Sequence, residues 1–131
     1  MSAGSLRAQA TEATRFVYTS ETDVGTNPNQ GPYAIYTKPA DVLYYYIERL
    51  FTRQTGGTPA SNYGQVHVVG RNGLYYPTVG DDLAQTRYDF SDTADWISNR
   101  PLDYDVLYSY ISSEVGNVGT MYVSLLVKEV L

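Results

Sequence analysis

The sequence predicts an α+β domain in which two helices pack on one face of a mainly antiparallel sheet. Three observations predict it: helical spacing of apolar residues in residues 41–51 and again in residues 101–116, a tight turn signal, and a long alternating strand at the end of the chain. The chain has 131 residues, about the length of one ordinary domain. We therefore expect a single domain over residues 14–131, preceded by a flexible arm at residues 1–13 that lacks a periodic apolar pattern.

The first two strands are expected on either side of a long loop. Residues 15–19 (RFVYT) are aromatic and β-branched, and residues 33–36 (YAIY) alternate after Pro32. The loop at residues 21–31 contains Asp, Gly, Asn and Pro, which excludes regular structure there. These features predict a hairpin in which the two strands pair with each other.

Residues 41–51 (DVLYYYIERLF) show the strongest helical pattern in the chain. The apolar residues that share one helical face are Leu43, Tyr46, Ile47 and Leu50. Pro39 suits a first helical turn, because an N–H at that position has no partner within the helix, and Gly56 follows as a stop signal. We therefore expect a helix here that packs on the sheet.

The clearest turn signal is Asn72-Gly73, since both residues accept the positive φ angles of a type I′ turn. It predicts a tight hairpin between residues 65–70 and residues 74–79. The pairs expected in this register are His67 with Thr78 and Val69 with Tyr76.

The last third of the chain is predicted to contain a helix and a strand. Residues 80–100 are acidic and allow a short strand at residues 86–90 (TRYDF). The helix over residues 101–116 has an apolar stripe formed by Val106, Leu107, Tyr110 and Ile111. Residues 120–131 (TMYVSLLVKEVL) follow as an interior strand of the sheet. Its core side is formed by Met121, Val123, Leu125 and Val127.

The two predicted helices carry similar sequences. Residues 41–47 (DVLYYYI) and residues 105–111 (DVLYSYI) differ at one of seven positions. A strand precedes each helix and a valine-rich strand follows, so the order strand, helix, strand occurs twice. This order is consistent with an internal duplication in a ferredoxin-like fold, and convergence at helix positions that pack on a sheet explains the similarity as well.

Composition excludes several classes of site. The chain has no cysteine, and so it forms no disulfide, thiolate zinc site, iron–sulfur cluster or cysteine nucleophile. His67 is the one histidine, which excludes a multi-histidine metal centre within the chain. The formal net charge of −5 argues against duplex nucleic acid as a partner, because phosphate binding needs clustered Lys and Arg.

No stretch approaches the roughly 20 apolar residues of a membrane span. Residues 1–14 also lack the hydrophobic centre of a secretory signal. We expect a soluble protein without a membrane partner, located in the cytoplasm or, if the source is viral, in the virion.

Candidate catalytic chemistry is sparse, and we expect no enzyme activity, cofactor or metal. A serine triad has to recruit His67, but a Gly-x-Ser-x-Gly elbow is missing and His67 lies between valines in a predicted hairpin. The acidic residues considered for a glycosidase pair are Asp81, Asp82, Asp89, Asp92 and Asp95, and those considered for a calcium site are Asp89, Asp92 and Asp95. The calcium-loop pattern around a central Gly is missing, and a solvated loop explains these acids better.

Tyrosine is the positive signal, with 14 Tyr among 131 residues against three Phe and one Trp. Tyr buries a large area and keeps one polar end, which is why it is enriched at protein interfaces. The runs at residues 44–46 and 75–76 cannot enter one core completely, since neighbours diverge by about 100° on a helix and point to opposite sides on a strand. The residues predicted to form an interface are Tyr44, Tyr45, Tyr75, Tyr76, Tyr122, Leu126 and Val130.

The layout resembles that of small virion proteins of tailed phages, of the tail-terminator and head-completion types. The resemblance depends on a short acidic chain without cysteine, a flexible lead, and a predicted second helix that runs into the strand at residues 120–131. No motif carries it, and such proteins often open with a helix, which this chain lacks. The resemblance implies a non-enzymatic protein that assembles as a ring or as an addition to a shell.

The leading hypothesis is therefore a structural subunit that packs with its own copies and with other proteins of one assembly through tyrosine-bearing surfaces. The alternative is a carbohydrate or peptide binding module. Its recognition surface is predicted to contain Tyr44, Tyr45, Tyr75, Tyr76 and Trp96. A small hydrolase that uses His67 or the aspartates is the third hypothesis.

Overall fold

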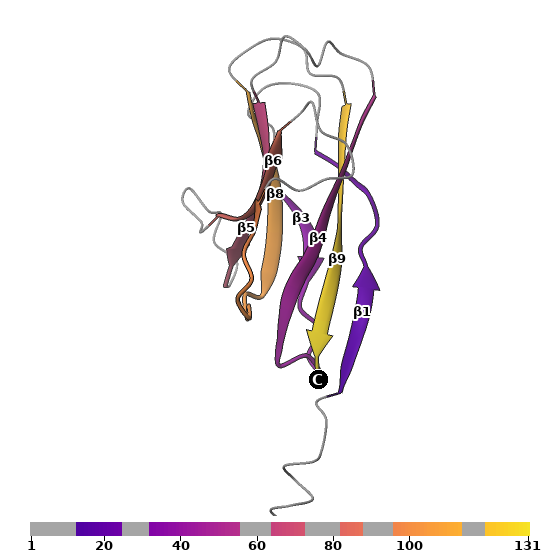
Figure 1. Ribbon diagram of the computed structural model, residues 1–131, viewed down its shortest axis with the longest axis vertical. Helices are drawn as coiled ribbons and strands as arrows, with labels where there is room; N and C mark the ends of the chain where they lie inside the picture. Colours follow the sequence, from indigo (N-terminus) through magenta and orange to yellow (C-terminus); the bar gives the residue numbers. More distant parts are fainter. Residues whose placement is uncertain (1–12, 25–31, 56–63, 73–81, 88–95, 114–119) are drawn as a thin grey trace, which may run out of the picture.

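The computed structural model describes residues 13–24, 32–55, 64–72, 82–87, 96–113 and 120–131. In this part of the chain every regular element is a β-strand, and the strands form two antiparallel sheets that lie as two layers (Figure 1). The β9 sheet consists of β1 (Thr14–Tyr18), β2 (Thr22–Asp23), β4 (Tyr44–Thr55) and β9 (Thr120–Val130). The β8 sheet consists, in spatial order, of β3 (Tyr33–Thr37), β8 (Val106–Ser113), β5 (Gly64–Arg71), β6 (Asp82–Arg87) and β7 (Trp96–Ile97).

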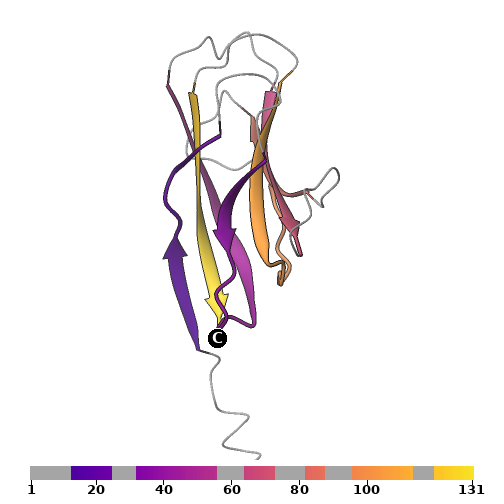
Figure 2. The same cartoon turned by 180° about the vertical axis from the view of Figure 1, so that it is seen from behind.

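The prediction of an α+β fold with two helices is wrong, because both predicted helices are strands. Residues 41–51 lie largely in β4, and the described part of residues 101–116 lies largely in β8. The ferredoxin-like arrangement is excluded with them. Instead, the two sheets pack face to face as a sandwich, and their inner sides supply the core (Figure 2).

A β-bulge explains why β4 has the apolar spacing of a helix. β4 pairs with β9 along its whole length, and the register shifts between Ile47 and Arg49. The buried side chains of β4 are Tyr45, Ile47, Leu50 and Thr52. A regular strand would bury every second residue, but the extra residue at Glu48 leaves Ile47 and Leu50 three positions apart, as on one face of a helix. The bulge thus accounts for the spacing of Ile47 and Leu50, whereas the other two residues of the predicted helical face are not in the core: Leu43 is 67% exposed and Tyr46 is half-buried.

The apolar spacing of β8 fits both a strand and a helix. Leu107, Ser109 and Ile111 are buried, while Tyr108 and Tyr110 are half-buried, so the side chains alternate. Leu107 and Ile111 are four residues apart, a spacing that lies on one side of a strand as well as on one face of a helix. β8 lies between β3 and β5, where β-branched and aromatic residues pack well.

The two similar segments have similar environments at their last four positions but not before them, since Leu43 is 67% exposed and the corresponding Leu107 is buried. At the one position where they differ, Tyr45 corresponds to Ser109, and both side chains are buried. Ile47 and the corresponding Ile111 are buried as well. The segments lie in different sheets, and the repeated order of strand, helix and strand that we predicted does not occur.

Both predicted hairpins pair differently in the structure. The first is wrong, because β1 pairs with β9 and β3 pairs with β8. For the second, residues 74–79 lie outside the described residues, and β5 pairs with β6 on one edge and with β8 on the other. The observed partners are Gln85 and Tyr110 for His67 and Asp82 and Tyr108 for Val69, in place of Thr78 and Tyr76.

The prediction of an interior strand at the end of the chain is confirmed. β9 pairs with β1 and β2 along one edge and with β4 along the other. Its fully buried apolar side chains include Met121, Val123, Leu125 and Val127. The strands predicted at residues 15–19 and 33–36 are also confirmed, as β1 and β3. The strand predicted at residues 86–90 overlaps the end of β6, and residues 88–90 lie outside the described residues.

An ionic cluster links the two sheets at one end of the sandwich. The carboxylate of Glu129 on β9 is 1% exposed and accepts hydrogen bonds from the Tyr36 hydroxyl on β3 and from Nε of Arg15 on β1. Arg15 also donates two hydrogen bonds of 3.0 Å to Asp41. Burial and the hydrogen bond to Glu129 raise the pKa of the Tyr36 phenol, and Arg15 holds the pKa of the Asp41 carboxyl below its usual value. The cluster therefore joins strands of both sheets.

The predicted division into an arm at residues 1–13 and one domain at residues 14–131 concerns residues that the structure describes only in part. Of the predicted arm at residues 1–13, Ala13 is described, and its carbonyl accepts a hydrogen bond of 2.8 Å from the Leu131 N–H. One core cluster contains buried residues of both sheets, from Val24 to Val127. In the described part of the chain, no helix has the length and apolar character that a bilayer crossing requires.

Candidate functional site

The outer side of the β9 sheet carries a cluster of large apolar side chains, which we call the aromatic face. Side chains alternate along a strand, so the residues between the buried positions point outward. The members of the aromatic face are Phe16 and Tyr18 of β1, Tyr44, Tyr46 and Phe51 of β4, and Tyr122 and Leu126 of β9. Phe16 is 60% exposed and Tyr18 is 71% exposed, which leaves much of both rings in contact with solvent.

The rings of the aromatic face contact one another within and between strands. Phe51 lies opposite Ser124 on β9, whose small side chain leaves room above the strand. The ring of Phe51 approaches that of Tyr18 on β1 across β9, with centroids 6.2 Å apart. Tyr44 and Tyr46 meet edge to face at 6.0 Å. These contacts join four of the rings into two pairs, one across β9 and one along β4.

Three basic side chains lie over rings of the aromatic face. The contacts are Arg53 over Tyr122 at 4.2 Å, Lys128 over Tyr46 at 5.7 Å and Arg49 over Phe51 at 6.0 Å. At such distances the ring quadrupole attracts the cation, by about 0.5–1 kcal/mol at exposed sites. The face is therefore both aromatic and charged.

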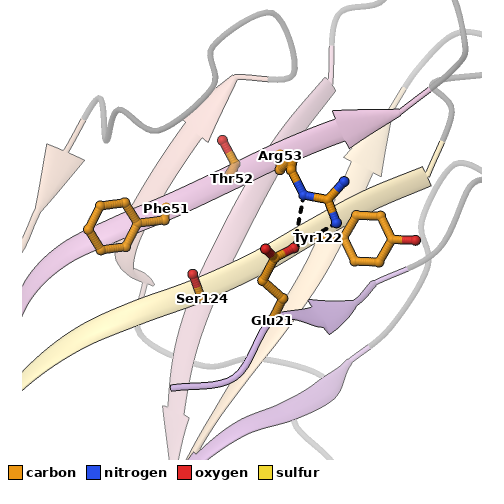
Figure 3. Close-up of a pocket in the computed structure, with 6 residues that line it drawn as sticks. All are labelled: Glu21, Phe51, Thr52, Arg53, Tyr122 and Ser124. Carbon is orange, nitrogen blue, oxygen red and sulfur yellow. Dashed lines mark hydrogen bonds and ion pairs between the residues drawn. The ribbon is translucent and has the colours of Figure 1, made fainter. Parts of the chain in front are cut away.

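A shallow depression lies beside Arg53 on this face (Figure 3). Nε of Arg53 donates a hydrogen bond of 3.0 Å to Glu21, which raises the pKa of the guanidinium. The depression is lined by Glu21, Phe51, Thr52, Arg53, Tyr122 and Ser124 and has a volume of about 60 Å³. Pockets for drug-sized ligands measure roughly 300–1,000 Å³, so the depression suits one side chain of a partner better than a small-molecule ligand.

His67 lies on the outer side of the β8 sheet, away from the aromatic face. Its ring stacks on that of Tyr110 with centroids 4.7 Å apart, and its Nδ1 lies 3.3 Å from a carboxylate oxygen of Asp82. Ser109, the neighbour of Tyr110, points to the opposite side of the sheet and is fully buried. The Oγ of Ser109 has no hydrogen-bond partner in the described part of the structure. His67 and Ser109 therefore do not form a pair of base and nucleophile.

The predicted interface residues fall into three groups. Those that belong to the aromatic face, where they are half-buried, are Tyr44, Tyr122 and Leu126. Those that are buried in the monomer, with exposed fractions of 0% and 2%, are Tyr45 and Val130. Those that lie outside the described residues are Tyr75 and Tyr76.

Tyr45 is buried because consecutive residues on a strand point to opposite sides of the sheet. Tyr44 and Tyr46 therefore point outward, while the Tyr45 ring packs on Tyr36 with centroids 4.8 Å apart. The Tyr45 hydroxyl donates a hydrogen bond of 2.8 Å to the carbonyl of Tyr104. The ring has its own partners inside the sandwich, and so it offers no surface to another molecule.

The sequence analysis missed four members of the aromatic face: Phe16, Tyr18, Tyr46 and Phe51. Phe16 and Tyr18 alternate within the strand predicted at residues 15–19, and that alternation is a signal for one exposed side. The predicted helix places Tyr46 on its apolar face. Recognition of residues 44–46 as a strand, in which side chains alternate between the two sides, would have placed Tyr46 on the outer side.

Among the described residues, no group of three or more His, Cys, Asp or Glu side chains is placed to hold a metal ion. The residues considered for calcium, Asp89, Asp92 and Asp95, lie outside the described part of the chain.

Comparisons of the chain with protein-family models, curated proteins and solved structures find no match. An assignment of function therefore depends on the chemistry of the surfaces that the structure describes.

Proposed function

We propose that the protein is a non-enzymatic structural subunit of a larger assembly that packs through the aromatic face. The observation that carries the proposal is the concentration of six rings and Leu126 on one outer side of one sheet. Contiguous apolar patches of this kind mark interaction sites on soluble proteins. The mixture of aromatic and Arg side chains is also the composition that protein interfaces favour.

A repetitive assembly fits a contact of modest size. Each copy in such an assembly is held by several neighbours, so a weak contact per subunit becomes strong through effective concentration. We extend the proposal to a place in the virion of a tailed phage. The chain resembles small virion proteins of such phages in its size, acidity and lack of cysteine. The predicted helix that supported this resemblance is β8, and so the aromatic face is now the main support for an assembly role.

A carbohydrate or peptide binding module is the second candidate, favoured by the exposed rings of Phe16 and Tyr18. The surface first predicted for it is divided in the structure, since Tyr44 points outward from the β9 sheet, Tyr45 is buried and Trp96 lies on β7 of the other sheet. Arg53 also covers one side of the Tyr122 ring at 4.2 Å, which hinders a sugar from stacking there. These features favour an assembly surface over a glycan surface.

The test of the proposed function is sedimentation of the tagged chain made together with the other proteins of its source. The unaltered chain is expected to sediment with a large particle, and Tyr18→Ser is expected to lower that fraction at least about fivefold. Trp96→Ser removes an aromatic ring that is 44% exposed on the other sheet and serves as the matched control. Sedimentation of the unaltered chain as a free small protein, or equal loss in both variants, would exclude an assembly role for the aromatic face.

A further inference from the structure

We propose that the aromatic face packs against the same face of a second copy of this chain, in a two-fold symmetric dimer that is the building block of the assembly. This inference rests on the proposed function and names the first partner of the aromatic face. A two-fold contact uses one surface twice, and so that surface has to complement itself in shape, in apolar character and in charge.

The charges on and beside the aromatic face balance. The basic side chains are Arg49, Arg53 and Lys128, and the acidic ones are Glu21, Asp23 and Glu48. These described residues give a formal charge of zero, whereas the whole chain carries −5. The described charges of two aromatic faces therefore add no net repulsion when the faces approach each other.

The arrangement of these charges is also suited to pairing with itself. Glu48 is exposed at the bulge of β4, next to Arg49. Lys128 of β9 lies opposite Tyr46 of β4. Glu48 thus follows the partner of Lys128 by two residues along β4, near the end of β9. When the face meets a second copy turned by 180°, Glu48 of each copy can lie against Lys128 of the other.

Other partners fit this surface less well. A nucleic acid strand would stack on the rings, but it would also bring phosphates against Glu21, Asp23 and Glu48. An acidic protein surface would meet the same three carboxylates. A second copy supplies both signs in equal number, and for this reason we commit to it.

The size of the aromatic face fits a weak, concentration-dependent dimer. β9 has 11 residues and the sheet is three strands wide at this place. At about 3.3 Å per residue and about 4.8 Å between strands, the flat footprint is roughly 500 Å². The accessible area of a surface roughened by large rings exceeds its footprint, which brings it toward the ~800 Å² per partner of a standard interface. Sheets that pack face to face in this way also give rings from both sides a common layer.

The experiment is a measurement of molar mass by light scattering after size exclusion, over a wide range of concentrations of the full chain. We expect a concentration-dependent change from monomer to dimer. Tyr18→Ser is expected to weaken the dimer at least about tenfold, as truncation of aromatic residues in interface centres commonly does. Trp96→Ser is the control on the other sheet, and circular dichroism checks that each variant retains its strands.

A charge exchange tests the two-fold geometry itself. Glu48→Lys places like charges across the interface at Lys128, and Lys128→Glu does so at Glu48, so each variant alone is expected to be monomeric. An equimolar mixture of the two variants restores opposite charges at both positions and is expected to form a heterodimer. The chain that carries both substitutions is expected to dimerise like the unaltered one.

Three results would overturn the self-pairing: a monomer at every concentration, equal weakening by Trp96→Ser and Tyr18→Ser, or a mixture of the charge variants that stays monomeric. Binding of a single-stranded DNA oligonucleotide that Lys128→Glu abolishes would overturn it as well. The inference and the proposed function fail in different ways. A monomer whose Tyr18→Ser variant no longer enters the particle refutes only the self-pairing. A dimer whose Tyr18→Ser variant enters the particle normally refutes the assembly role.

Discussion

The two sides of the β9 sheet come from the same four strands and yet differ in chemistry. The inner side is mainly aliphatic apart from Tyr45 and Thr52, and its buried acid, Glu129, has hydrogen-bond partners on β1 of the same sheet and on β3 of the other. The outer side is aromatic, and its basic side chains lie over rings. The inner residues of the sheet are buried in the core, while the outer ones form the surface that we propose for packing with a partner.

The largest expected effect distinguishes two glutamates on these two sides. Glu129→Ala leaves the buried Tyr36 hydroxyl without its acceptor and removes one partner of Arg15, which is 40% exposed and keeps Asp41, so we expect a loss of about 2 kcal/mol in the free energy of unfolding. Glu48→Ala removes an exposed acid and is expected to change the free energy by less than about 0.5 kcal/mol in dilute solution. Urea denaturation measures both. Similar values for the two variants would contradict the contrast between the two sides.

A smaller effect separates two adjacent tyrosines of β4. Tyr45→Phe removes the donor to the Tyr104 carbonyl inside the sandwich, and we expect a loss of about 1 kcal/mol. Tyr46→Phe keeps the ring on the outer side and is expected to be neutral within about 0.5 kcal/mol. The same denaturation experiment compares the two variants. A larger loss in Tyr46→Phe than in Tyr45→Phe would show that the sides of β4 are assigned incorrectly.

The smallest expected effect concerns pH. Arg15 lowers the pKa of Asp41 in the folded protein below its usual value of 3.8. The stability that this pair contributes is therefore fully present above that value and is lost as the pH falls through the lower pKa of the folded state. We expect the difference in urea midpoint between the unaltered chain and Asp41→Asn to shrink as the pH is lowered from neutral to well below 3.8. A difference that is independent of pH would exclude a contribution from the charge of Asp41.

The sequence predicted β9 well and β4 poorly, for a physical reason. Met121, Val123, Leu125 and Val127 alternate without interruption, so period two is the one pattern they fit. In β4 the bulge at Glu48 interrupts the alternation of buried and exposed side chains. The residue types in that segment do not predict a bulge. The tyrosines of residues 44–46 are good strand formers and were a signal for a strand, but their spacing with neighbouring apolar residues was given more weight.

The candidate site was predictable to the extent that its strands were. Tyr122 and Leu126 were found because β9 was recognised as a strand with one core side. Tyr45 was placed on the surface because a helix separates three consecutive rings by equal angles, whereas a strand puts the middle one on the opposite side. Pairing between strands distant in sequence, which brings Tyr18 of β1 to Phe51 of β4, leaves no local trace in the sequence.

The cluster around Glu129 has a further consequence for how β9 finds its place during folding. Because four apolar residues alternate along β9, a slip of the strand by two positions would still present apolar side chains to the interior. Such a slip would bring Val127 or Leu131 to the position of Glu129 and leave the Arg15 guanidinium and the Tyr36 hydroxyl without the carboxylate that both contact. Glu129 therefore favours the observed register of β9 over registers shifted by two residues, which the apolar residues alone would tolerate.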